Sequence, residues 1–181
     1  MRTFVSLFFL AGTLFLLSAC SNIKYASDFK SGTDFSPLKT YSWRAVTIDI
    51  AGVDQNRLQQ LADKQLRTQG FRLVTANADM SIDMQVFTRV SQGGNTSLGI
   101  GIGMPVGRHG SIGLGTGQTL GRGKPEGVIV IDITQAGNNL LIWRGSAEGI
   151  PLVSFSLGNE QKLRDSFTKI LHAFPPSRLA N

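Results

Sequence analysis

Cysteine and histidine are almost missing from this sequence, which has one cysteine and two histidines in 181 residues. A single thiol excludes an internal disulfide framework, and it also excludes zinc sites that are built from several cysteines. The only imidazole ligands are His109 and His172, which lie 63 positions apart. We therefore expect neither a bound metal nor a cofactor.

Clustered positive charge is also missing. Charged residues make up 17% of the chain, and no two Lys or Arg residues are adjacent. Proteins that bind nucleic acid gather such residues into a patch or stripe, so the sequence predicts no nucleic-acid partner. The hydrophobic fraction of 41% is typical of one globular domain with its own core.

The N-terminus has the pattern of a signal peptide. A basic start is followed by an uncharged apolar run over 4–17 and by the small residues Ser18 and Ala19. A membrane-spanning helix needs about 20 apolar residues, and the polar Ser21 and Asn22 end this run early. The pattern favours a cleaved signal over an uncleaved anchor.

The one cysteine, Cys20, ends the sequence Leu-Ser-Ala-Cys, which resembles the lipobox of bacterial lipoproteins at all four positions. The resemblance implies that Cys20 is acylated and anchors the protein, and that Ser21 directs it to the periplasmic face of the outer membrane. Several acyl chains give a stable anchor where one does not. The alternative is an ordinary secretory signal. We expect a signal peptide over 1–19, a lipidated tether over 20–24, a folded domain over 25–176 and a short tail over 177–181.

Periodic apolar residues predict the elements of the folded domain. Strands are expected at 23–29, 40–43, 78–90, 127–133 and 140–147. Helices are expected between Asp54, as N-cap, and Gly70, and from about 160 to Pro175. This order predicts an α+β domain with two layers: a mainly antiparallel sheet of about five or six strands, and two amphipathic helices on one face.

A glycine-rich segment, 93–127, holds 13 of the 21 glycines. It fits neither phosphate-binding glycine pattern. It does contain a repeat, SLGIGIG from Ser97 and SIGLGTG from Ser111, which suits a hairpin with one bare backbone face. No acidic residue lies between 84 and 125, so Arg108, Arg122 and Lys124 are the candidate partner-binding residues. The alternative is a mobile loop without a partner.

Several motifs of the domain resemble, in order and spacing, the bacterial lipoproteins that carry the domain of unknown function 4136. The resemblance covers roughly 25–176 and rests on the motifs DFSPLKTYSW, LRTQGFRLV, ADMSIDMQV, EGVIVIDI, NNLLIWRGSA and ILHAFPP. It implies an envelope lipoprotein with an α+β domain, and it brings no activity, cofactor or catalytic residue.

Together these features predict a non-catalytic module that binds an envelope protein, an anionic glycan or anionic lipid. One alternative is a carrier of a small apolar ligand held near Trp43, Met80 and Met84. A hydrolase is a further alternative, but Gly-x-Ser-x-Gly is absent, and Asp79 and Asp83 would lie about 13 Å apart along a strand. We therefore expect that the protein is not an enzyme, and we assign no catalytic residue.

Overall fold

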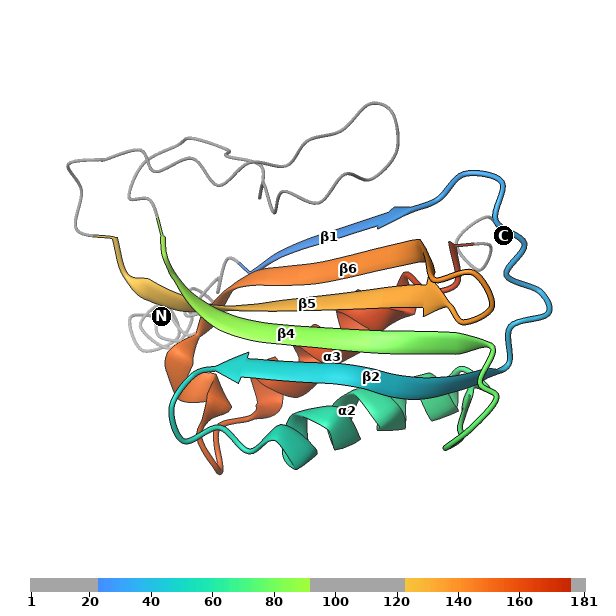
Figure 1. The fold of residues 1–181 in the computed structure, drawn as a ribbon. Coiled ribbons are helices and arrows are strands. Elements are labelled where there is room, and N and C mark those ends of the chain that lie inside the picture. Colours follow the sequence, from blue (N-terminus) through green and yellow to red (C-terminus); the bar gives the residue numbers. More distant parts are fainter. Residues whose placement is uncertain (1–22, 92–122, 177–181) are drawn as a thin grey trace, which may run out of the picture.

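A computed structural model describes residues 23–91 and 123–176. Within these residues the chain forms one six-stranded sheet, with two helices packed together on one of its faces (Figure 1). The strands are β1 (Lys24–Phe29), β2 (Thr40–Asp49), β3 (Arg72–Leu73), β4 (Met80–Val90), β5 (Pro125–Gln135) and β6 (Leu140–Pro151). The helical segments are α2 (Gln55–Thr68), the short 3-10 helix η3 (Leu152–Phe155) and α3 (Gln161–His172). The predicted α+β class is confirmed.

The sheet is mixed but mostly antiparallel. Its strand order is β1-β6-β5-β4-β2-β3, and only the pairs that β2 forms with β3 and β4 are parallel. The parallel pairs arise because α2 carries the chain back to the end of the sheet at which β2 began. The predicted hairpin of β5 and β6 is present, with Asn139 in the left-handed region at φ 53°.

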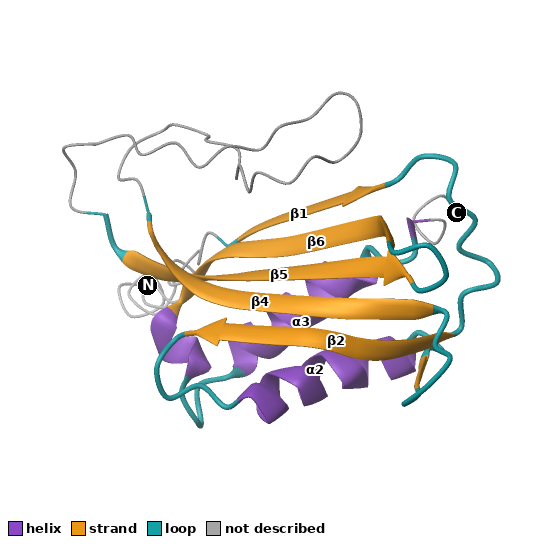
Figure 2. Cartoon of the chain, viewed as in Figure 1, coloured by secondary structure: helices purple, strands orange, loops and turns teal. Residues whose placement is uncertain are grey.

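Strand β4 shows how the alternating sequence pattern determines the two faces of the sheet. Met80, Ile82, Met84 and Val86 are all buried, at 1% exposure or less, while the residues between them lie on the opposite face. Figure 2 shows both helices on the same side of the sheet. No helix among the described residues covers the other face.

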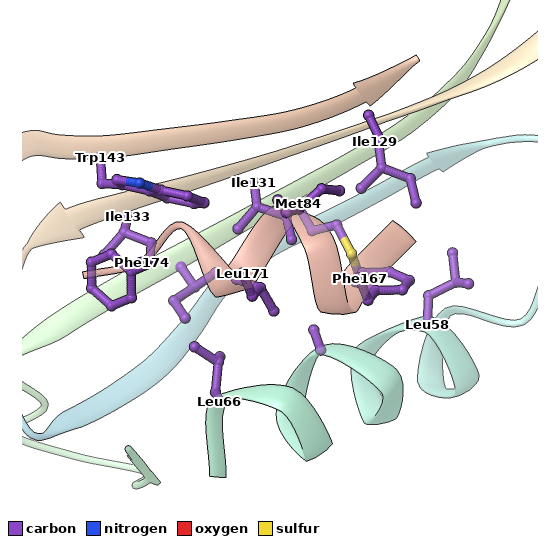
Figure 3. Packing of buried hydrophobic residues seen from close by; sticks show 14 of the residues in the cluster. Leu58, Leu66, Met84, Ile129, Ile131, Ile133, Trp143, Phe167, Leu171 and Phe174 are labelled. Atoms are coloured by element: carbon purple, nitrogen blue, oxygen red, sulfur yellow. The ribbon is translucent and has the colours of Figure 1, made fainter. Parts of the chain in front are cut away.

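The core lies between the sheet and the two helices (Figure 3). Trp143 of β6 is buried there, with its ring 5.3 Å from the ring of Phe174. Residue 145 has to be glycine, because a Cβ at that position would lie 2.2 Å from the Trp143 ring and 2.8 Å from Ile170. The sequence therefore provides the space that its largest side chain fills.

The ends of both helices agree with the sequence. The Asp54 carboxylate accepts a hydrogen bond from the Asn56 backbone N–H at 2.8 Å, as expected of an N-cap. Gly70 follows α2 with φ 91°, a conformation that favours glycine. His172 is exposed in the last turn of α3, where a positive charge is favourable.

One polar residue of α2 lies on the buried side of the helix, where the sequence pattern predicted only apolar residues. Asp63 is 7% exposed. Its carboxylate accepts hydrogen bonds from the Tyr41 hydroxyl at 2.7 Å and from the Trp43 indole N–H at 3.0 Å. Burial, followed by the bond to Asp63, raises the pKa of Tyr41 above its ordinary value. These contacts fasten α2 to β2, and they explain why Trp43 packs at the edge of the core.

Candidate functional site at the tethered end of the sheet

The predicted site residues divide between the two parts of the chain. Cys20, Arg108 and Arg122 lie outside the described residues. Lys124 is described, and it is exposed directly before β5. Its ammonium forms no ion pair with any residue in the described ranges.

Lys124 belongs to a stem at which both ends of the glycine-rich segment meet. The Ser91 backbone N–H and hydroxyl both donate to the Lys124 carbonyl at 2.9 Å, and the Lys124 N–H donates to the Ser91 hydroxyl at 3.0 Å. Gly123 approaches this stem so closely that a Cβ would lie 1.8 Å from the Ser91 carbonyl oxygen. Ser91 and Lys124, which flank the glycine-rich segment, therefore lie next to each other at one place on the sheet.

The stem lies at the same end of the sheet as the start of β1. Val90 pairs with Pro125, Glu126 pairs with Pro151, and Lys24 of β1 pairs with Glu148. The start of β5 and the end of β6 lie together on the left of Figure 1. We call this the tethered end, because the chain reaches it four residues after Cys20, the residue that the sequence predicts to carry the lipid tether. The sequence alone did not indicate that the tether and the glycine-rich segment share one end.

Arg89 ties three strands together at the tethered end. Its guanidinium lies 2.7 Å from the Glu126 carboxylate and 2.7 Å from the Glu148 carboxylate. Burial lowers the pKa of Arg89, but the hydrogen bond to Glu126 and the charge of Glu148 outweigh it, so the pKa lies above its usual value. The guanidinium balances one of the two carboxylates, so this trio keeps one net negative charge. The exposed Lys24 and Lys124 outweigh that charge and leave this group of residues with a net positive charge.

A second charged row crosses the open face of the sheet. Arg144 donates two hydrogen bonds of 2.6 Å to Asp132, and Arg44 pairs with Asp83 on the other side. Asp83 and Asp132 are direct partners on β4 and β5. The hydrogen bonds to Asp132 raise the pKa of Arg144. The row holds two like charges side by side between two guanidinium groups, an arrangement that fixes the register of the strands.

The remaining sequence candidates lie apart from one another. Asp79 accepts hydrogen bonds from the backbone N–H groups of Lys39 and Thr40 and from the Thr40 hydroxyl, which lower its pKa. It thus closes the β2 to β4 crossover. Asp83, in contrast, forms an ion pair, and its partner is Arg44. Across residues 23–91 and 123–176, no three His, Cys, Asp or Glu side chains are gathered as metal ligands.

The space proposed for an apolar ligand is filled by the protein itself. Met80 and Met84 are fully buried and pack within the core. A hollow of about 350 Å³ lies instead at the end opposite the tether, where its lining includes Phe35, Lys39 and Phe71. No helix in the described part of the chain has the length and hydropathy to cross a bilayer.

Comparison with known proteins identifies the family. A family model described as a domain of unknown function (DUF4136) matches residues 25–176. The protein belongs to this family. A search of curated protein sequences finds no match.

Solved structures of other proteins are similar to this chain. A PDZ domain protein from Parabacteroides distasonis matches with a TM-score of 0.51 at 16% identity, covering 83% of this chain and 35% of that protein. Two PelC dodecamers from Paraburkholderia phytofirmans match with TM-scores of 0.47 and 0.48 at 14% and 12% identity. These matches cover 82% of this chain in both cases, and 95% and 96% of the PelC chains. At such identities the likeness concerns the fold alone.

Proposed function

We propose that this DUF4136 protein is a non-catalytic envelope module, held by an acylated Cys20 at the periplasmic face of the outer membrane. It binds an envelope protein or an anionic glycan or lipid through its glycine-rich segment. One observation carries the proposal: the stem of that segment and the start of β1 lie at the same end of the sheet. The stem therefore lies near the membrane to which the proposed anchor at Cys20 attaches the domain.

The electrostatics of the described residues support an anionic partner. Lys124 is exposed and lacks an ion pair within the described part of the chain, whereas the nearby Glu126 and Glu148 are engaged by Arg89. Arg122 lies one residue before the described stem and adds a second positive charge in sequence. Exposed positive groups steer anionic partners toward a surface and orient them there.

The test combines photo-crosslinking in living cells with charge neutralisation. A photo-reactive residue replaces Gly107 in the glycine-rich segment, and a control replaces the exposed Gln60 of α2. We expect a discrete adduct at position 107 alone. The triple variant Arg108→Gln, Arg122→Gln, Lys124→Gln should lose that adduct, because it removes the charges that attract the partner.

A matched control neutralises two arginines and one lysine elsewhere. Lys64, Arg67 and Arg72 are all exposed, and their replacement by Gln should leave the adduct at position 107 in place. Metabolic labelling with a fatty-acid analogue tests the anchor separately, since Cys20→Ser should abolish the label. A labelled protein that yields no adduct at position 107 would refute the binding role and leave the anchor standing.

A further inference from the structure

The tethered end also exposes apolar side chains that the proposed partner-binding role does not use. Leu157 is 83% exposed and Val153 is 59% exposed, both in the turn that follows β6. Val90, at the end of β4, is 63% exposed. Single exposed apolar residues are ordinary on protein surfaces, but these three lie at one end of the sheet.

The turn that carries Val153 and Leu157 is held firmly by its neighbours. Phe155 is 2% exposed and packs on Gly127, where a Cβ would lie 2.4 Å from its ring. The Arg57 guanidinium donates to the Phe155 carbonyl oxygen. Ser154 and Phe155 are both buried, whereas Val153 and Leu157, two positions to either side of Phe155, are exposed.

Backbone hydrogen bonds complete this turn. The Ser156 N–H donates to the Val153 carbonyl at 3.1 Å, and the Asn159 N–H donates to the Ser156 carbonyl at 3.3 Å. Gly158 has φ 86°, which turns the chain directly after Leu157. Glu160 accepts from Arg164 and lies 3.8 Å from Arg57, so its charge is compensated. The apolar tip is therefore presented by an ordered and ion-paired base.

Strand register places this tip next to the anchor. β1 and β6 are antiparallel and Lys24 pairs with Glu148, so the start of β1 and the end of β6 lie at the same end of the sheet. Four chain steps separate Cys20 from Lys24, a reach of at most about 14 Å. Four residues likewise separate Glu148 from the start of η3, roughly 13 Å at strand rise. A lipid-linked Cys20 thus holds Val153 and Leu157 close to the lipid surface.

We infer that Val153 and Leu157, together with Val90, form a second membrane contact that enters the lipid interface beside the acylated Cys20. Lys24 and Lys124 flank this contact and suit anionic headgroups. The contact orients the domain on the membrane, with the stem of the glycine-rich segment facing the surface and the hollow at the far end facing away from it. The inference rests on the proposed acylation of Cys20.

The first test uses the acylated full chain in vesicles of phosphatidylethanolamine and phosphatidylglycerol that contain brominated lipid. Leu157→Trp should show emission that brominated lipid quenches beyond the wild-type background of Trp43 and Trp143. The matched control is Leu140→Trp, since Leu140 is 38% exposed at the opposite end of β6, roughly 26 Å from Glu148 at strand rise. Its emission should not be quenched further. Equal quenching at both positions, or none at position 157, would overturn the inference.

A second test avoids adding a tryptophan, which itself favours interfaces. The acylated double variant Val153→Ser, Leu157→Ser should transfer between vesicles about tenfold faster than wild type, because it loses buried apolar surface. Leu140→Ser should transfer at the wild-type rate. Unchanged transfer of the double variant would refute the membrane contact whatever the quenching shows. A mass measurement that finds Cys20 unmodified would instead overturn the anchor and the contact together.

Discussion

The buried Asp63 makes a stringent test of how the helical layer is fastened to the sheet. In Asp63→Ala, the Tyr41 hydroxyl and the Trp43 indole N–H lose their shared acceptor, at 2.7 Å and 3.0 Å respectively. A hydrogen bond to a charged group contributes about 1.5–3 kcal/mol, and Tyr41 is fully buried, so its hydroxyl would find no water. Trp43 is partly exposed and recovers some of its loss from solvent. We expect the free energy of unfolding to fall by about 3 kcal/mol.

The assay is urea unfolding followed by circular dichroism, with Gln60→Ala on the exposed face of the same helix as the control. Asp63→Asn should lose less than Asp63→Ala, because it keeps an oxygen acceptor in place. A double-mutant cycle with Tyr41→Phe should give a coupling energy of about 1–2 kcal/mol. A loss below about 0.5 kcal/mol in Asp63→Ala, the range of ordinary surface substitutions, would refute the reasoning.

Three further predictions concern other parts of the fold. Because the pKa of Tyr41 is raised in the folded state, the contribution of Tyr41 to stability should be complete below about pH 10 and should decline as the pH rises further. Unfolding measured as a function of pH would show this decline, and Tyr41→Phe should remove it. The pKa of Asp79 is lowered, so the difference in stability between wild type and Asp79→Asn should be present at neutral pH and should shrink below about pH 4. A difference that persists in acid would contradict the hydrogen bonds assigned to the carboxylate. Gly123→Ala forces a Cβ against the Ser91 carbonyl and should destabilise the stem by about 1–3 kcal/mol, seen as faster amide exchange at Lys124. Unchanged exchange there would show that the stem tolerates a side chain.

Much of the fold could be predicted because it depends on local periodicity. The alternation in β4 and the helical spacing around Leu58 and Leu66 determine which side chains are buried, and the structure buries them. The ends of α2 at Asp54 and Gly70 depend on one residue each, so they could also be predicted from the sequence. Asp63 was missed because helical spacing places a residue on a face only approximately, and the acceptor it provides serves two donors 20 and 22 positions away.

Only part of the candidate site could be predicted from the sequence. Lys124 was selected because it belongs to the stretch between 84 and 125 that has no acidic residue, and it is exposed in the structure. Arg89 and its two carboxylates were missed as a group, since Glu126 and Glu148 lie 37 and 59 positions away along the chain. Val153 and Leu157 carry no sequence pattern that separates them from core residues. Only the structure shows that Ser154 and Phe155 are the buried residues of this turn and that Val153 and Leu157 are its exposed ones.

The sequence by itself determined the elements of this protein: two amphipathic helices, strongly alternating strands and one glycine-rich segment between two of them, preceded by a stretch at Cys20 that resembles a lipobox. These are properties of neighbouring residues, so the spacing along the chain is enough to reveal them. Only the tertiary structure decided that the start of β1, the stem and the exposed apolar turn share one end of the sheet. That arrangement follows from strand order and register, which depend on how β1 pairs with β6 across more than a hundred residues of intervening chain.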